Sequence, residues 1–223
     1  MNRVVNHAFP NIKRALPGAL CAPLFAIMAL VHMSAYAFTV NITPGSRVVY
    51  LAVGNGSFAG TLQAGGTPAT NATVNTVTAT VPANVVGSGA AQAMNTNSTQ
   101  ATSFWDGFTF CAPATQQVYI GGFFRMPGAA GNATLTVSTS VGGLVSAGGD
   151  TIPFSQIRWA SSGAGDTGAE VIPAGAFTGG TQTLATFAVN TWNESCHTFS
   201  YLNSSVVAAG TYTGRATYTL SAP

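Results

Sequence analysis

The stretch Ser103-Phe104-Trp105-Asp106-Gly107-Phe108-Thr109-Phe110-Cys111 places four aromatic residues within seven positions and ends at a cysteine. A second stretch, Thr191-Trp192-Asn193-Glu194-Ser195-Cys196-His197-Thr198-Phe199, again surrounds a cysteine with aromatic residues. Aromatic side chains bury large apolar surfaces, so segments this rich in them are expected in a core. We therefore predict that the two stretches are two halves of one core, joined by a disulfide between Cys111 and Cys196.

The disulfide prediction depends on export, and the start of the chain has the pattern of a secretory signal peptide. Three basic residues precede an apolar run over residues 15–31, and Ala35 and Ala37 follow as the small residues that a signal peptidase reads. The apolar run is short for a membrane span. We predict a cleaved signal peptide over residues 1–37 and no transmembrane segment afterwards. Residues 38–223 then form one secreted or surface-displayed domain, in which paired cysteines form disulfides.

Charge is sparse in the processed chain, which has four arginines, five acidic residues and no lysine. Binding to nucleic acid requires clustered positive charge, so we predict no nucleic-acid partner. A net charge near zero favours association between protein molecules. The composition therefore favours a protein that packs against copies of itself or against other surface subunits.

Alternation of apolar and polar residues is the dominant pattern, and it predicts β-strands. The clearest example covers residues 212–220, where Tyr212, Tyr218 and Leu220 share one face and the other carries three threonines and Arg215. Clusters of Gly, Pro and Asn separate such segments, and helical patterns are nearly absent. We predict an all-β chain folded as a single antiparallel immunoglobulin-like β-sandwich of about eight to ten strands, with one disulfide.

No catalytic site is predicted. Nucleophilic hydrolysis needs a base beside a serine or cysteine, and the only histidine after processing, His197, adjoins the disulfide residue Cys196. A glycoside hydrolase needs two carboxylates across a cleft, and Asp106 with Glu194 is the pair that the disulfide would bring near each other. We rank this hydrolase hypothesis last and predict that the protein is not an enzyme.

No metal or cofactor site is predicted either. A single histidine beside the cysteines gives too few ligands for a metal such as zinc. Asp150, Asp166 and Glu170 lie in glycine-rich loops, but their spacing does not match the twelve-residue calcium loop. Turn carboxylates exposed to water are the simpler interpretation.

The aromatic stretches also suggest a ligand patch. Trp105 and Trp192, with Asp106 and Glu194 beside them, have the composition of a sugar-binding surface, because sugar rings stack on exposed aromatic faces. A carbohydrate-binding adhesin is therefore the alternative functional hypothesis. The competing interpretation is that both tryptophans pack in the core.

Both ends of the processed chain alternate in the same way. Phe38, Val40 and Ile42 form the apolar face at the start, and the segment 212–220 does so at the end. A terminal strand either closes its own sheet or pairs with the exposed edge of a neighbour. We predict that these terminal strands mediate assembly.

The sequence Gly210-Thr211-Tyr212-Thr213-Gly214-Arg215-Ala216-Thr217-Tyr218-Thr219-Leu220 resembles the terminal strand of bacterial fimbrial and spore-coat-U-type subunits. The resemblance implies an incomplete immunoglobulin-like sandwich that a neighbour's N-terminal strand completes. It also implies a Gram-negative cell, with a periplasmic chaperone and an outer-membrane pore as partners in export. Those subunits usually join cysteines close together and early in the chain, unlike Cys111 and Cys196. The expected function is a structural subunit of a pilus-like surface filament or of a coat.

Overall fold

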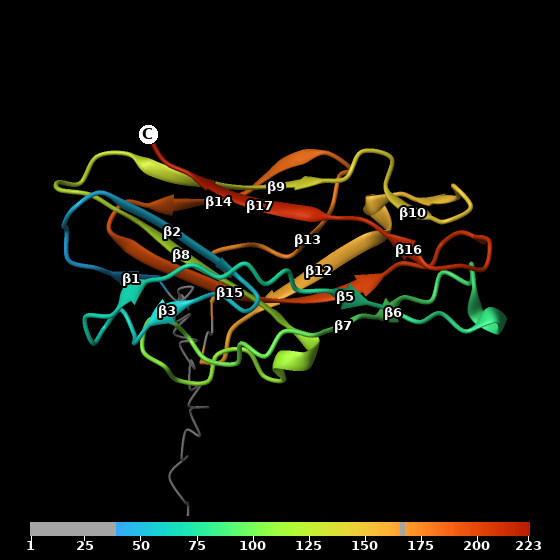
Figure 1. The fold of residues 1–223 in the computed structure, drawn as a ribbon, viewed down its shortest axis with the longest axis horizontal. Helices are drawn as coiled ribbons and strands as arrows, with labels where there is room; N and C mark the ends of the chain where they lie inside the picture. The colour runs from blue at the N-terminus through green and yellow to red at the C-terminus, as the bar shows by residue number, and fades with distance from the viewer. Residues whose placement is uncertain (1–38, 166–167) are drawn as a thin grey trace, which may run out of the picture. The chain divides into compact units, whose positions relative to one another are not determined.

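The computed structural model describes residues 39–165 and 168–223, so the predicted signal peptide, Phe38 and Asp166 lie outside the described residues. The described chain consists of antiparallel strands joined by turns, with three single-turn 3-10 helices (Figure 1). This confirms the prediction of an all-β antiparallel sandwich with one disulfide. The described residues form seventeen strands, more than predicted, because several strands of only two residues occur inside long connections.

The largest sheet has seven strands in the order β13-β12-β15-β8-β2, and β1 and β6 also pair with β15. Its strands are β1 (Thr39–Asn41), β2 (Val48–Val53), β6 (Gln92–Ala93), β8 (Val118–Arg125), β12 (Ile157–Ser162), β13 (Gly175–Ala176) and β15 (Thr191–Tyr201). β15 is the central strand of this main sheet. β8 pairs along one of its edges, and β1 and β12 follow each other along the other edge.

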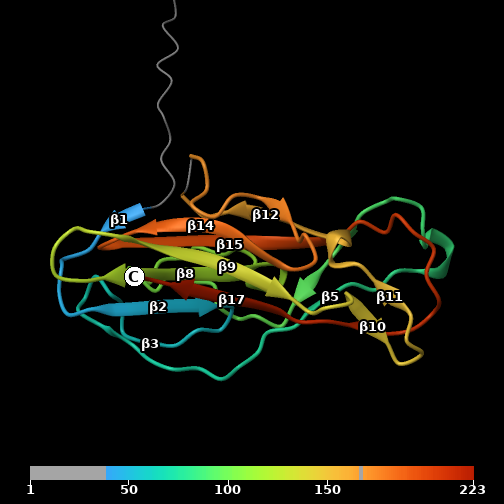
Figure 2. The same ribbon diagram turned by 90° about the horizontal axis from the view of Figure 1, so that it is seen from above.

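A three-stranded sheet packs across one face of the main sheet and forms the second layer of the sandwich (Figures 1 and 2). Its order is β14-β9-β17, with β9 (Asn132–Thr139), β14 (Thr181–Ala188) and β17 (Ala216–Ser221). Ile120 and Phe124 of β8 meet Leu135 of β9 and Phe187 of β14 between the layers, and all four side chains are fully buried. The alternating apolar face of each strand thus builds the interior.

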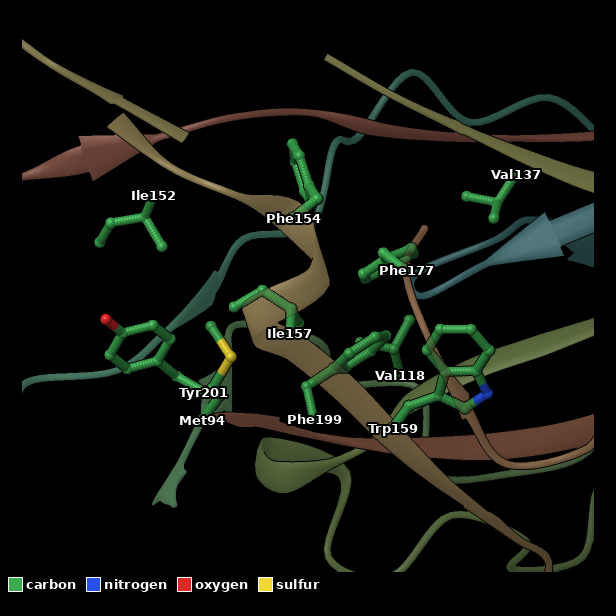
Figure 3. Close-up of a cluster of buried hydrophobic side chains, with 10 residues drawn as sticks. All are labelled: Met94, Val118, Val137, Ile152, Phe154, Ile157, Trp159, Phe177, Phe199 and Tyr201. Atoms are coloured by element: carbon green, nitrogen blue, oxygen red, sulfur yellow. The ribbon is translucent and has the colours of Figure 1, made fainter. Parts of the chain in front are cut away.

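The same interior continues toward one end of the sandwich as a second cluster of buried side chains (Figure 3). Phe177 packs against Trp159 with ring centroids 5.0 Å apart. The indole N–H of Trp159 donates a hydrogen bond to the carbonyl of Pro173 at 2.9 Å, so its polar atom is satisfied inside the core.

We call the long connection of residues 54–117 the covering segment. Its residues Phe58, Leu62, Phe104, Trp105 and Phe110 pack on the opposite face of the main sheet. Its strand β6 instead extends the main sheet, and Met94 packs in the sandwich interior. The covering segment contains β3 (Phe58–Ala59), β4 (Thr67–Pro68), β5 (Val77–Thr78), η1 (Ala83–Val85), β6, β7 (Asn95–Thr96) and η2 (Ala114–Gln116). Because the main sheet is covered on both faces, β8 and most of β15 are buried at every position instead of at alternate ones.

The predicted strand over residues 212–220 is interrupted, which corrects the sequence interpretation. β16 (Tyr212–Thr213) joins a small sheet with β10 (Leu144–Ser146) and β11 (Thr151–Ile152), next to the 3-10 helix η3 (Phe154–Gln156), whereas β17 pairs with β9. The break lies at Gly214 and Arg215. A Cβ atom on Gly214 would stand 2.8 Å from the ring of Phe154, so a glycine is needed where the chain passes that ring.

Candidate functional site

The disulfide between Cys111 and Cys196 is present, as predicted, with 5.5 Å between the two Cα atoms. Both cysteines are fully buried. The bond joins the end of the covering segment to the middle of β15, so it holds the covering segment, which forms a third layer, against the main sheet.

Parts of the two aromatic stretches share one core, as predicted, whereas Phe199 packs in the sandwich interior and Phe108 is exposed. We call this core the aromatic cluster; it lies between the main sheet and the covering segment. Its rings belong to Tyr50, Phe58, Phe104, Trp105, Phe110, Tyr119, Phe123 and Trp192. Most contacts between these rings are edge-to-face or offset, as between Phe104 and Tyr119, whose centroids are 5.3 Å apart.

Glu194 lies at the bottom of the aromatic cluster and is completely buried. The hydroxyl of Ser103 lies 2.8 and 2.9 Å from its two carboxylate oxygens, and the hydroxyl of Tyr119 donates a hydrogen bond to Oε2. Ser103 in turn accepts a hydrogen bond from the backbone N–H of Trp105 at 2.9 Å. The buried acid therefore fastens the Trp105 loop, residues 103–110, to the main sheet.

Gly121 makes room for this network. It stands directly opposite Glu194 in the pairing of β8 with β15. A Cβ atom at this position would lie 2.3 Å from the hydroxyl oxygen of Tyr119, two residues earlier on the same face. A glycine inside a strand often marks such a close approach. The pair Tyr119 and Gly121 was the available sequence signal for the network, and the sequence interpretation missed it, as it missed Ser103.

Burial dominates the electrostatics of Glu194. Loss of hydration raises the pKa of the carboxyl group above its ordinary value, although hydrogen bonds from Tyr119 and Ser103 favour the charged form. The indole N–H of Trp192 also acts to lower the pKa of the carboxyl group, although it makes no hydrogen bond of normal geometry. Burial and the adjacent carboxylate raise the pKa of Tyr119 well above its ordinary value. With its oxygens bonded and no access to solvent, the network acts as a structural clamp.

The predicted ligand patch is not assembled at the surface, because Trp192 and Glu194 are fully buried. Trp105 is half-buried, and Asp106 accepts a hydrogen bond from the backbone N–H of Phe108 within a turn. The residue that the turn exposes is Phe108, at 75%. Glu194 and Asp106 therefore do not face each other across an open cleft, and this pair does not have the geometry of glycoside hydrolase carboxylates.

His197 points to the other face of β15, into the sandwich interior. It is fully buried and stacks on Trp159 with ring centroids 5.6 Å apart. Neither of its ring nitrogens has a hydrogen-bond partner in the described chain, and burial lowers its pKa to about 3. Ser195, two residues earlier, directs its hydroxyl to Glu170 at 3.3 Å. The pair of serine and histidine lacks the hydrogen bond that nucleophilic catalysis requires.

The predicted N-terminal assembly strand is β1, which pairs with β15 of its own chain. Thr39, Val40 and Asn41 stand opposite Asn193, Trp192 and Thr191, respectively. Ile42 is buried in the aromatic cluster and Val40 packs against it, so the apolar face of this strand is inserted in its own chain, whereas the prediction placed it in a neighbouring copy. Phe38, the first residue of the predicted set, lies outside the described residues.

The predicted C-terminal assembly residues face the interior of the sandwich. Tyr218 packs against both parts of the interior, Leu220 against one part, and Tyr212 against the other from β16. β17 pairs only with β9 among the described strands, so it forms an edge of its sheet. Its apolar face is occupied within the chain, and only its backbone edge remains for a partner.

Within residues 39–165 and 168–223, no three His, Cys, Asp or Glu side chains are grouped so that they could hold a metal ion. In the same part of the chain, no helix has the length and apolar character needed to cross a membrane.

Comparisons with protein-family models, with curated proteins and with solved structures found no match to this chain. The resemblance to fimbrial and spore-coat-U-type subunits therefore rests on the sequence alone and remains a hypothesis.

Proposed function

We propose that this protein is an exported structural subunit of a bacterial surface filament or coat, and that copies join by exchanging strand β1. The observation that carries the proposal is the position of β1. It is the first strand of the described chain, it is only three residues long, and it pairs with β15 alone among the described strands. Such a strand is exchanged between copies at low cost.

The contacts of β1 do not depend on which copy supplies it. Val40 and Ile42 fill the aromatic cluster, and the backbone N–H of Ile42 donates to the carbonyl of Asn190 at 2.9 Å. The same strand from a second copy would make the same contacts in the same register. Residues 43–47, which contain Pro44 and Gly45, connect β1 to β2 on the far side of β8 and are the natural hinge for opening.

Other properties of the chain suit a subunit of this kind. A buried disulfide and the absence of lysine from residues 38–223 fit an exported protein that associates with copies of itself. A periplasmic chaperone would protect the vacated edge of β15 before assembly, and an outer-membrane pore would allow export.

Crosslinking across the β1–β15 pair tests the proposal. Thr39 and Asn193 are paired, so Thr39→Cys with Asn193→Cys places two thiols across this junction. Under oxidising conditions, exchanged strands give a ladder of covalent dimers and larger species on a non-reducing gel. Light scattering of the unmodified protein measures the same assembly without a crosslink.

The matched control is a pair of strands that remain in the same chain when β1 is exchanged. Val48 and Arg125 are paired between β2 and β8, so Val48→Cys with Arg125→Cys crosslinks only within a chain. If the Thr39 and Asn193 variant also gives only internal crosslinks while the protein assembles, strand exchange is wrong. A protein that stays monomeric at high concentration contradicts the whole proposal.

A second candidate, a carbohydrate-binding surface protein, is favoured by the Trp105 loop alone. Phe108 is largely exposed at its turn, with the half-buried ring of Trp105 and the carboxylate of Asp106 nearby. Exposed aromatic rings next to a carboxylate suit a sugar. Glycan-array binding that is lost in Phe108→Ala, with unchanged folding, would favour this candidate, and the absence of any glycan signal removes it.

A further inference from the structure

The outer face of the sheet β14-β9-β17 is covered by a regular grid of hydroxyl side chains. Side chains at alternate positions of each strand point outward, and the strand register aligns them in three rows. The rows are Thr217, Ser138 and Thr181; Thr219, Thr136 and Thr183; and Ser221, Thr134 and Thr186. We call these nine residues the hydroxyl grid. All of them are partly or fully exposed.

A bulge in β14 keeps the grid in register. The pairing of β14 with β9 shifts between Thr183 and Ala185, which adds one residue to β14. The threonine spacing shifts with it, because Thr181 and Thr183 are two positions apart but Thr186 follows three positions later. As a result Thr186 still stands opposite Thr134. The hydroxyl face is thus preserved across an irregularity that would otherwise turn it inward.

The chemistry of the hydroxyl grid is unusual for an exposed surface. Outward faces of strands normally carry charged side chains of both signs, but no charged or aromatic side chain belongs to the grid. Arg215, two positions before Thr217, is charged, but it lies in the break before β17 begins and outside the nine positions. An uncharged surface is complementary to a partner that is itself uncharged. The lack of aromatic rings disfavours sugars, which stack on such rings.

The spacing of the grid indicates which uncharged partner fits. Neighbouring strands lie about 4.7–4.9 Å apart, and outward residues along one strand repeat every 6.4–6.8 Å or so. Oxygen atoms on the faces of hexagonal ice repeat at comparable distances in two directions. Thr136 and Thr181 donate their hydroxyl hydrogens within the sheet, to the carbonyl of Thr219 and to the hydroxyl of Ser138. Their oxygens can still accept a hydrogen bond from water. Each threonine also offers a methyl group that orders the water around it. We propose that the hydroxyl grid is an ice-binding surface.

The grid lies on an outer layer, where no described strand covers it (Figure 1). Adjacent strands are rotated relative to one another by roughly 20–25°, so the match to a flat crystal face is best over the central strand. We therefore expect slowed recrystallisation of ice, together with at most a small depression of the freezing point. The inference is independent of β1, which belongs to the other sheet.

The experiment measures ice recrystallisation and incorporation of the oxidised, secreted protein into slowly growing ice. The unmodified protein is expected to slow recrystallisation and to enter the ice fraction. Thr136→Lys places a long charged side chain at the centre of the grid and should abolish both effects. Thr219→Lys repeats the test from the neighbouring strand in case the central substitution disturbs folding. Circular dichroism and thermal melting confirm that each variant is folded.

Thr213→Lys is the matched control, because Thr213 is exposed on β16, outside the grid. It should retain full activity. An unmodified protein without effect on ice, or grid variants that behave like the control, overturns the proposal. Binding to insoluble neutral polysaccharide that Thr136→Lys abolishes, or self-association that it abolishes, would assign the face to those partners instead and would equally overturn ice binding.

Discussion

At the scale of single residues, β15 carries two buried titratable side chains on opposite faces. Glu194 lies under the aromatic cluster with two hydroxyl partners, and His197 lies in the sandwich interior with none. Burial disfavours the charged form of both, which raises the pKa of the acid and lowers that of the histidine. The two residues therefore affect stability in opposite directions as the pH changes.

Replacing His197 by phenylalanine should remove an acid sensitivity. Between pH 6.5 and about 3, the unfolded chain binds a proton that buried His197 cannot bind, so the free energy of unfolding falls as the pH falls. The slope from this one group approaches about 1.4 kcal/mol per pH unit. His197→Phe keeps a ring against Trp159 and removes two unpartnered nitrogens, and a gain of about 1 kcal/mol at neutral pH is expected. Urea denaturation over this pH range measures both effects; an unchanged pH slope would contradict them.

Replacing Glu194 by glutamine should have the opposite pH signature. Its folded-state pKa is raised above 4.5, so in the window above 4.5 the folded chain retains a proton that the unfolded chain has lost. The free energy of unfolding therefore falls as the pH rises through that window. Glu194→Gln removes this pH dependence of the free energy of unfolding. The new amide N–H groups would face the donating hydroxyls of Ser103 and Tyr119, so we also expect the free energy of unfolding to fall by about 1–3 kcal/mol. A difference between the two proteins that does not vary with pH would show that the carboxyl group is unperturbed.

Adding a methyl group at Gly121 should displace the hydroxyl of Tyr119 from Glu194. The expected destabilisation is about 1–3 kcal/mol, from overpacking of a filled site. Gly180→Ala is the control, because a Cβ atom there meets no other atom within 4 Å. Thermal unfolding of the two variants side by side measures the effect. Equal melting temperatures would mean that the interior adjusts around the new methyl group.

At the scale of elements, the covering segment has few regular strands and depends on its attachments to β15. The disulfide closes a loop with a sequence separation of 85 residues, which in the chain-entropy model contributes about 4–5 kcal/mol. Cys111→Ser with Cys196→Ser should lower the free energy of unfolding by up to that amount. The change should appear as a lower midpoint in urea, while a reducing agent should affect only the unmodified protein. A midpoint that reduction leaves in place would show that the aromatic cluster alone holds the layer.

At the scale of the whole molecule, the sandwich and its disulfide could be predicted, because period-two alternation and two remaining cysteines are direct signals. The third layer could not. Trp192 and Glu194 lie on one face of β15, and alternation along the strand does not reveal what packs on that face. The covering segment that buries them has little regular structure, so no pattern in the sequence predicts its position. The placement of Ser103 opposite Glu194 depends on that segment, so the clamp stayed hidden. Gly214 was assigned to a continuous strand, because the close approach of the chain to the ring of Phe154 at this position exists only in the folded protein.

The disulfide also has a mechanical consequence. If neighbouring copies are linked through β1, a pulling force on the filament enters each subunit at the Trp192 end of β15, four residues before Cys196. The disulfide connects Cys111 directly to Cys196, so the residues from Cys111 to Trp192 are bypassed and this tension cannot extend them. At about 3.3–3.6 Å per residue, the hidden length is nearly 300 Å. A filament of such subunits would extend less under load, because each oxidised subunit keeps a large part of its chain behind the bond.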